Sequence, residues 1–135
     1  MNYKRYLLTF FFVVTGFTAL QAQTQRGKAS YYTKKWTGRK TASGERLHHD
    51  SMTCAHRKHP FGTLLRVVNT TNQKSVIVRV NDRGPYRKGC IVDLSWGAAK
   101  AIGMLQRGIV TVTVKVVKPE ELKTMTALPD STSSE

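Results

Sequence analysis

Carboxylates are scarce in the part of the chain that has the composition of a folded domain, residues 27–117. Against seventeen lysines and arginines, this stretch holds four acidic side chains, at Glu45, Asp50, Asp82 and Asp93. Carboxyl groups and histidines are the usual side chains for giving and taking protons in catalysis. Acid–base chemistry by a carboxyl group in this domain is therefore confined to these four residues.

Each carboxylate has a functional and a structural interpretation. Glu45 lies in the small-residue loop 41–45, where a backbone can approach a ligand closely. Asp82 follows a strand end and precedes Arg83, so it is either a functional group or half of a structural ion pair. Asp93 lies two residues before a predicted helix N-cap, where a carboxylate often satisfies backbone amides. Asp50 lies in a polar loop and is expected to be solvated.

The histidines do not indicate a metal site. The four lie at His48, His49, His56 and His59. Their spacing matches none of the usual zinc patterns, so we predict neither a metal nor a cofactor. His56 is more interesting as a hydrogen-bonding partner for a carboxylate.

Two cysteines and three aromatic residues each leave alternatives open. Cys54 and Cys90 either form a disulfide or remain two buried free thiols. Which one holds depends on the distance between their Cα atoms, which the sequence does not give. Tyr31, Tyr32 and Trp36 could stack on sugar rings, although a tyrosine pair on a short strand commonly places one ring in the core.

The first 22 residues have the pattern of a signal peptide. Lys4 and Arg5 precede an apolar run, Tyr6–Val14, which continues more weakly to Leu20, and Ala22 suits a cleavage site. The alternative, a retained membrane anchor, needs roughly 20 predominantly apolar residues, and this run is diluted by threonine and glycine. No cysteine follows the run, so no lipid attachment is predicted. We expect an exported protein of the periplasm or cell envelope, without a stable membrane span after cleavage.

The charge of the chain predicts an anionic partner. The formal net charge is +14, and removal of Lys4 and Arg5 with the signal peptide leaves +12. A protein this basic associates with polyanions. Nucleic acid fits by charge, but an exported protein rarely meets it, so we expect no nucleic-acid partner. The cell wall is the other polyanion; the alternative is that the lysines only confer solubility.

Hydrophobic periodicity predicts a mainly β domain. Alternating, β-branched segments at 63–69 and 75–81 flank a polar turn at 70–74 and are typical of a hairpin. A clean alternation predicts another strand at 109–117, and 27–32 and 90–92 are shorter candidates. One helix is predicted at 96–102, with Ser95 as its N-cap and Gly103 near its end.

These segments define the predicted domain organisation. Residues 1–22 form the signal peptide, 23–26 a linker, 27–117 one compact barrel and 118–135 a polar, disordered tail. We expect the barrel to be monomeric.

Six sequence blocks carry a resemblance to a known family. They are Gly27–Tyr32, Gly38–Glu45, Thr53–Arg57, Pro60–Thr63, Val78–Pro85 and Ile91–Ser95. In this order they resemble the rare lipoprotein A family, and they are spread along most of the domain, from residue 27 to residue 95. The resemblance implies a six-stranded double-psi β-barrel with one or two short helices. It also implies lytic transglycosylase activity on peptidoglycan glycan strands, preferentially strands without stem peptides. The competing class is a non-catalytic binding module like that of expansins.

The resemblance also implies which residues act. Glu45 and Asp82 match the family's functional carboxylates, with His56 as a third polar member. Asp93 is the rival, because its segment is similar to the one that supplies the acidic residue of expansins. Three arginines, Arg39, Arg57 and Arg83, are candidates for holding the free lactyl carboxylate of a stripped strand.

Overall fold

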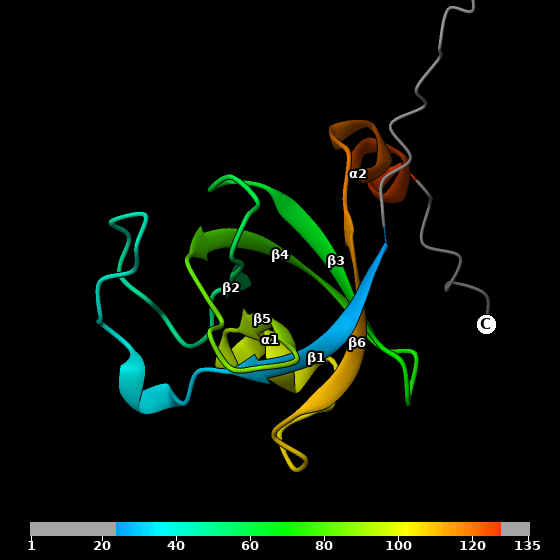
Figure 1. Cartoon of the computed structure of the whole chain (residues 1–135). Coiled ribbons are helices and arrows are strands. Elements are labelled where there is room, and N and C mark those ends of the chain that lie inside the picture. The colour runs from blue at the N-terminus through cyan, green and yellow to red at the C-terminus, as the bar shows by residue number, and fades with distance from the viewer. Residues whose placement is uncertain (1–23, 128–135) are drawn as a thin grey trace, which may run out of the picture.

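The protein folds into a closed six-stranded β-barrel, which the computed structural model describes over residues 24–127 (Figure 1). The strands are β1 (Gln25–Tyr31), β2 (Thr53–Ala55), β3 (Leu64–Asn69), β4 (Ser75–Asp82), β5 (Cys90–Leu94) and β6 (Val110–Val116). Around the barrel their order is β1-β5-β2-β4-β3-β6. The pairs β1–β5 and β2–β4 are parallel and the other four are antiparallel. The fold is thus mainly β, as predicted.

The barrel interior is filled by side chains from alternate strand positions. Leu65 and Val67 of β3 face Val78 and Val80 of β4 in the core, and all four are fully buried. β-Branched residues fit this half-buried pleated surface. The predicted hairpin is confirmed, with Leu65 paired to Val78 across it.

One helix closes an end of the barrel. Helix α1 (Trp96–Ala101) begins as predicted at Ser95, whose Oγ accepts a hydrogen bond from the Ala98 backbone N–H at 3.2 Å. Such a cap satisfies an amide that has no partner within the helix. The helix packs Ala98, Ala99 and the following Ile102 into the core.

Several segments differ from the sequence-based expectation. Strand β2 has only three residues, too few to show a period, and the 3-10 helix η1 (Lys34–Trp36) is equally short. Strand β1 begins inside the expected linker 23–26, because Gln25 and Arg26 pair with β6. The described residues begin at 24, so the predicted signal peptide lies outside them.

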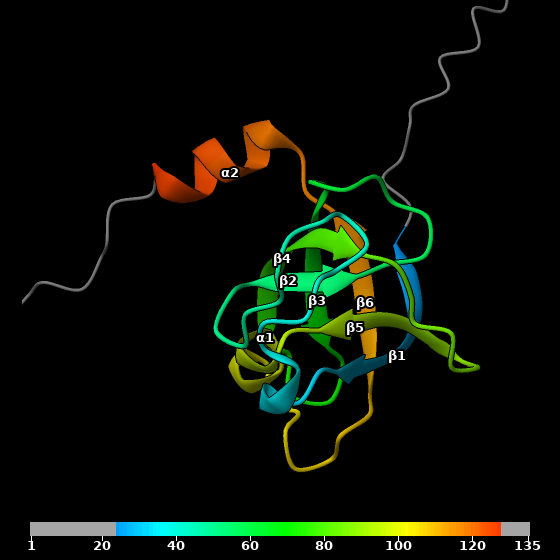
Figure 2. The ribbon, with the colours of Figure 1, turned by 90° about the vertical axis from the view of Figure 1, so that its left-hand side faces the viewer.

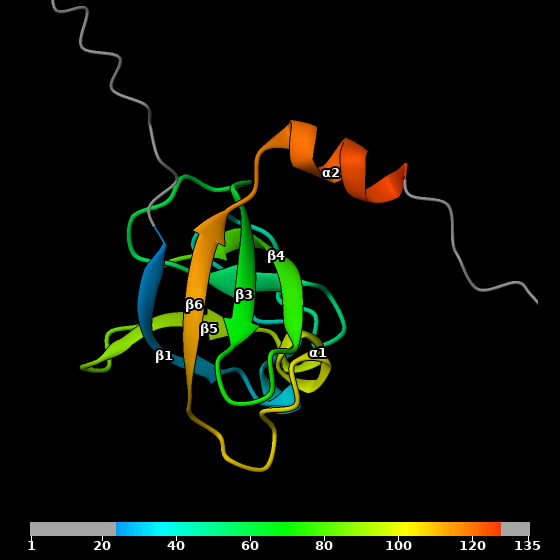
Figure 3. The same cartoon turned by 90° about the vertical axis from the view of Figure 1, so that its right-hand side faces the viewer.

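The predicted disordered tail is wrong for the segment nearest the barrel. Helix α2 (Pro119–Thr126) begins with proline at its first position and carries Glu120 and Glu121 in its first turn, both of which favour helix initiation. It buries none of its residues and extends away from the barrel in Figures 2 and 3. The tail beyond residue 127 lies outside the described part. No helix within residues 24–127 has the length and apolarity needed to cross a bilayer.

The two cysteines are buried free thiols in this structure. Cys54 lies on β2 within the core, and burial raises the pKa of its thiol to about 12, with the charge of Asp93 adding to the effect. A thiol that holds its proton so firmly is a poor nucleophile.

Candidate active site

Asp93 faces out of the barrel because of its position in β5. Its neighbours Val92 and Leu94 both belong to the hydrophobic core. Successive side chains of a strand point to opposite faces, so Asp93 points away from the core. Its partners on the adjacent strands are Ser30 of β1 and Ala55 of β2.

Asp82 reaches the same face through a β-bulge. Val78 and Val80 of β4 face the core, so an unbroken alternation would direct residue 82 inward as well. The pairing with β2 shifts after Cys54–Val80: the next pair is Ala55–Asp82, and Asn81 is left over. A bulge of this kind re-aims the side chain that follows it. The extra residue therefore directs Asp82 outward, onto the face that carries Asp93.

Ala55 is the spacer between the two carboxylates. It pairs with Asp82 on one side and with Asp93 on the other, and it is fully buried. Unlike Cys54 beside it, Ala55 is not part of the hydrophobic core cluster. Cross-strand partners share a face of the sheet, so a single methyl group separates the two acids.

The two carboxylates line a groove with two arms. The tryptophan arm encloses about 290 Å³ and is lined by Tyr32, Trp36, Arg39, Lys40, Thr41, Leu47, Asp82, Arg83, Gly84, Pro85, Tyr86 and Asp93. The arginine arm encloses about 440 Å³ and is lined by Ser30, Tyr31, Thr33, Pro85, Tyr86, Arg87, Asp93, Gly108 and Ile109. Asp93, Pro85 and Tyr86 belong to both arms, so Asp93 stands where the arms meet.

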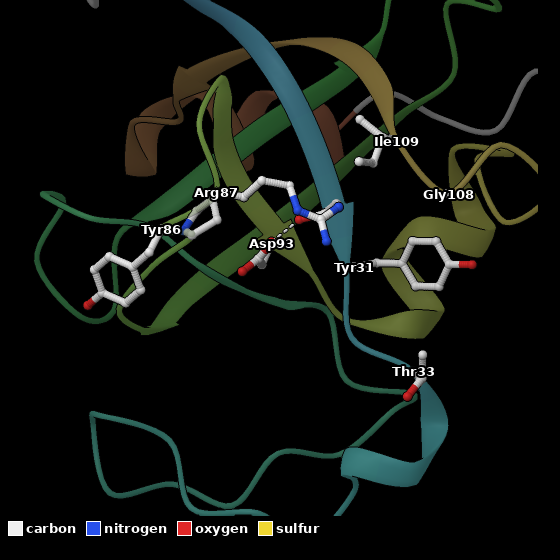
Figure 4. A pocket seen from close by; sticks show the side chains of 9 residues that line it. Tyr31, Thr33, Tyr86, Arg87, Asp93, Gly108 and Ile109 are labelled. Carbon is white, nitrogen blue, oxygen red and sulfur yellow. Dashed lines mark hydrogen bonds between the residues drawn. The ribbon is translucent and has the colours of Figure 1, made fainter.

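Figure 4 shows the arginine arm from close by. Tyr86 lies on one side of Asp93, and the guanidinium of Arg87 lies between Asp93 and Tyr31 in this view. Tyr86 is 83% exposed, so its ring is available to a ligand. Gly84 adopts a positive φ of 126°, which favours glycine, and a Cβ there would lie 3.7 Å from Asp93 Oδ2. The loop thus leaves the approach to Asp93 open.

Asp82 is surrounded by hydrogen-bond donors. The Tyr32 hydroxyl donates to Oδ2 at 2.7 Å, and the backbone N–H groups of Ala42 and Arg83 donate to Oδ1 at 2.9 and 2.8 Å. Burial, together with the Asp82 carboxylate, raises the pKa of Tyr32, which keeps the phenol a neutral donor. Asp82 is therefore held in one orientation as an acceptor.

Asp93 has the environment of a proton donor. Burial raises the pKa of its carboxyl group above the ordinary value, and the nearby charge of Asp82 acts in the same direction. A hydrogen bond donated by Ser30 Oγ and the charge of Arg87 oppose this effect without cancelling it. The two acids thus have different surroundings, which is how a pair of carboxyls divides acid and base roles.

Glu45 does not face the groove. Its carboxylate accepts two hydrogen bonds from the Arg79 guanidinium, at 2.5 and 2.8 Å, and this partner lowers its pKa. Both side chains are substantially exposed. The backbone of the same loop reaches the site, because Thr41 lines the tryptophan arm and Ala42 contacts Asp82.

His56 is also directed away from the groove. Its ring Nδ1 accepts hydrogen bonds from the backbone N–H groups of Lys58 and His59, and Nε2 lies 3.1 Å from Gln25 Oε1. Burial lowers the pKa of His56 to about 4, helped by the positive charge of His59 and neighbouring cations. The structure connects His56 to the site through its backbone N–H, which donates to the Asp82 carbonyl at 3.2 Å.

The predicted arginines divide by what they already bind. Arg57 donates to the carbonyls of Pro85 and Cys90, at 2.6 and 2.9 Å, and so holds both ends of the loop that carries Tyr86. Arg83 donates to the carbonyls of His56 and His59. Arg39 lies in the tryptophan arm, stacked 4.3 Å from the centre of the Trp36 ring. Its guanidinium makes no hydrogen bond within the described part of the chain.

The predicted aromatic residues lie in different arms. Tyr32 and Trp36 line the tryptophan arm, with their ring centres 6.3 Å apart. Tyr31 lines the arginine arm, packs against the core, and donates its hydroxyl hydrogen to the Leu105 carbonyl at 3.0 Å. One ring of the tyrosine pair is thus partly structural, as the sequence allowed.

Sequence reasoning missed four residues of the site, three that line the groove and the buried spacer Ala55. They are Ser30, Ala55, Tyr86 and Arg87. An aromatic ring in the otherwise polar loop between Gly84 and Gly89 was a usable signal for Tyr86. Ala55 gave none, because its role comes entirely from its two strand partners.

A group of possible metal ligands lies outside the groove. Ligand atoms of His48, His49 and Asp50 lie within 4.8 Å of one another. His48 and Asp50 are exposed, and His48 Nδ1 already accepts a hydrogen bond from the Asp50 backbone N–H at 3.2 Å. None of these side chains lines either arm.

Comparisons with known proteins establish the family. A family model described as lytic transglycolase, built on the double-psi β-barrel domain, matches residues 24–114. The chain belongs to this lytic transglycolase family. The closed six-stranded barrel is therefore a double-psi β-barrel, as the resemblance implied.

Curated relatives of the family agree with this assignment. A probable endolytic peptidoglycan transglycosylase RlpA of Nostoc sp. is 49% identical over 94 residues, covering 68% of this chain and 25% of the relative. The Vibrio cholerae and Aquifex aeolicus proteins, named as an endolytic and a probable endolytic peptidoglycan transglycosylase RlpA, are 48% and 50% identical. The match to the Vibrio cholerae protein covers 70% of this chain and 36% of that protein. The match to the Aquifex aeolicus protein covers 69% of this chain and 41% of that protein. The chain thus spans between a quarter and two-fifths of these relatives.

Solved structures support the fold. An expansin of Clavibacter michiganensis has a TM-score of 0.58 and 24% identity, covering 72% of this chain and 52% of the expansin. The Streptomyces papain inhibitor has a TM-score of 0.56 and 27% identity, covering 71% of this chain and 96% of that protein.

Proposed function

We propose that this protein is an endolytic lytic transglycosylase that cleaves peptidoglycan glycan strands between N-acetylmuramic acid and N-acetylglucosamine. The observation that carries the proposal is the pair Asp82 and Asp93, set on either side of Ala55 in a groove that continues past Asp93 in both directions. A groove with two arms suits an internal bond of a polymer. The names of the relatives point to the same reaction.

Asp93 is the proton donor in this mechanism. Its raised pKa lets it hold a proton to higher pH than an ordinary aspartate, and it stands at the junction of the two arms, where the bond to be cleaved would lie. As the bond between the muramic acid C1 and the bridging oxygen breaks, Asp93 transfers its proton to that oxygen. The leaving sugar therefore departs as an alcohol.

Asp82 is the acceptor in the second half of the reaction. The C6 hydroxyl of the muramic acid attacks its own C1 and closes a 1,6-anhydro ring, while its proton passes to Asp82. The donors around Asp82 hold it ready to accept. No protein nucleophile and no water are consumed, and Asp82 returns its proton to solvent as Asp93 takes one up.

Glu45 and His56 act on Asp82 indirectly. The Glu45–Arg79 ion pair holds the loop whose Ala42 N–H donates to Asp82. The His56 backbone supports the end of β4 through the Asp82 carbonyl. We therefore assign both as positioning residues.

The arms supply binding groups for the sugars. Trp36, Tyr32 and Tyr86 offer aromatic faces, and Arg39 offers a guanidinium able to bind a lactyl carboxylate bidentately. Arg57, which lines neither arm, supports the groove wall through its backbone contacts. Arg83 lines the tryptophan arm, and the carbonyls of His56 and His59 hold its guanidinium in place. With this substrate the protein would act outside the cytoplasm, which agrees with the signal peptide predicted at residues 1–22.

Product analysis tests this proposal. The purified mature chain would be incubated with glycan strands stripped by amidase, and the fragments weighed by mass spectrometry. Fragments that end in 1,6-anhydro-muramic acid support the lytic transglycosylase. Reducing ends, which weigh one water more, would instead mean hydrolysis; binding without fragments would mean a non-catalytic module like that of expansins.

A further inference from the structure

A second pocket lies at the opposite end of β1 from the groove. This histidine pocket encloses about 380 Å³ and is lined by Thr24, Gln25, His56, Arg57, Lys58 and His59. The groove is lined near the other end of the strand by Ser30 and Tyr31. Five residues of extended strand separate Gln25 from Ser30, or roughly 16 Å. The histidine pocket shares no lining residue with either arm of the groove, so both sites can be occupied at the same time.

The lining of the histidine pocket is basic and has no counterion. Arg57 and Lys58 carry permanent charges, and neither forms an ion pair within the described part of the chain. The described residues include six acids, and none of them lines this pocket. Charges of one sign gathered in a concave surface focus their field and attract ions of the opposite sign.

The two histidines are placed to respond to an anion. Their ring centres lie 4.3 Å apart, and His56 is fixed as the neutral form with its proton on Nε2, because Nδ1 accepts two backbone hydrogen bonds. Burial lowers the pKa of both rings, and for His56 the neighbouring positive groups lower it further. That repulsion is what a bound anion would relieve.

We propose that the histidine pocket is a second binding site, for an oxyanion of the phosphate or carboxylate type carried by a cell-wall polymer. Lys58 and the His59 ring supply the donors, while Arg57, tied to the carbonyls of Pro85 and Cys90, adds charge from a fixed position. Occupied independently of the groove, the pocket would hold the protein on the wall between cleavage events. Nothing in this site depends on the chemistry assigned to the groove.

Inorganic phosphate is the direct probe of the pocket. The mature chain labelled with ¹⁵N would be titrated with phosphate at constant ionic strength, following the backbone amides of residues 56–59 by NMR. The proposal expects saturable shifts there, and affinity at least about tenfold weaker in the double variant Lys58→Gln/His59→Gln. The matched control is Lys74→Gln/Lys115→Gln, which removes two exposed lysines elsewhere and should leave the affinity unchanged. Equal affinity in all three proteins, or shifts spread evenly over the surface, would overturn the proposal.

Sedimentation with cell walls then identifies the carrier. The Asp93→Asn chain, which should leave the glycan uncut, would be mixed with whole walls and with walls whose phosphodiester-linked polymers have been removed by hydrofluoric acid. Binding that is lost on removal identifies a phosphodiester polymer, and binding that persists identifies carboxylates of the peptidoglycan. In either case the Lys58→Gln/His59→Gln change must weaken sedimentation severalfold, and undiminished sedimentation would reject the wall-binding role.

Discussion

Asp82 and Asp93 face the same groove and differ in what surrounds them. Within the described residues, three donors converge on Asp82, whereas Asp93 receives a single hydrogen bond, from Ser30, and burial raises its pKa. The sequence identified both residues as candidates, because the domain has so few acids. The resemblance ranked Asp82 ahead of Asp93. The contacts that distinguish the two come from residues distant in the sequence, such as Tyr32 and Ala42, and could not be predicted.

The pH dependence of cleavage should report the protonation of Asp93. A general acid works only while protonated, so activity should fall as the pH rises through the raised pKa of Asp93. Ser30 and Arg87 both lower this pKa, so Ser30→Ala and Arg87→Gln should each move the alkaline limb of the kcat/KM profile to higher pH. The control Ser75→Ala changes an exposed serine away from the groove and should leave the profile in place. Movement to lower pH in the Ser30 variant would contradict the assignment.

Glu45 should behave as one half of a positioning pair. If its role is to hold the loop through Arg79, then Glu45→Gln and Arg79→Gln should lower kcat by similar factors, about tenfold or less. The double variant should be no worse than either single change, because both remove the same ion pair. The alkaline limb should not move. A far larger loss for Glu45→Gln than for Arg79→Gln would show that Glu45 reacts directly.

At the scale of elements, the site is made by a bulge and a three-residue strand. Alternation in the sequence correctly predicted β3, β4 and β6, and on that pattern residue 82 would have pointed into the core. The extra residue at Asn81 reverses this, and it is visible only in the pairing of β4 with β2. Because β2 itself is too short to predict, the meeting of Asp82 and Asp93 across Ala55 could not be read from the sequence.

Enlarging Ala55 should separate cleavage from folding. Ala55→Val places a branched side chain between the two carboxylates, on a strand where valine fits the backbone. We expect kcat to fall more than tenfold, with a loss of stability of about 1–3 kcal/mol from overpacking. Ala101→Val, at an exposed position in the last turn of α1, is the control. Activity assays and urea unfolding measure the two effects, and full activity in a folded Ala55→Val protein would contradict the spacer role.

At the scale of the whole molecule, composition narrowed the candidate residues, while the family resemblance predicted the fold. The scarcity of acids and the excess of lysine and arginine directed attention to few carboxylates and an anionic partner. The same composition could not predict which basic side chains already bind groups of the protein itself. Arg57 and Arg83 resemble Arg39 in the sequence, yet they bind backbone carbonyls that only the closed barrel brings near.

Acid should destabilise the fold through His56. The pKa of His56 is about 4 in the folded protein, against an ordinary value of 6.5. Between these two pH values the His56 ring is protonated in the unfolded chain and neutral in the folded chain. Stability from this residue is complete above pH 6.5 and is lost as the pH falls toward 4, by up to about 3 kcal/mol. Urea unfolding at pH 7 and pH 4.5 should show a smaller loss for His56→Gln than for the unaltered chain. An equal loss in both proteins would mean that His56 is not the group responsible.

The most direct test of the whole account is a comparison of three single variants on stripped glycan strands. Asp93→Asn and Asp82→Asn each remove one ionisable group from the groove, and Asp50→Asn is the matched change at an exposed aspartate outside it. The release of anhydro-muramyl ends would be measured by mass spectrometry for folded proteins of equal concentration. The account predicts a loss of at least about a hundredfold for both groove variants and unchanged activity for Asp50→Asn. Near-normal product formation by Asp93→Asn would contradict it.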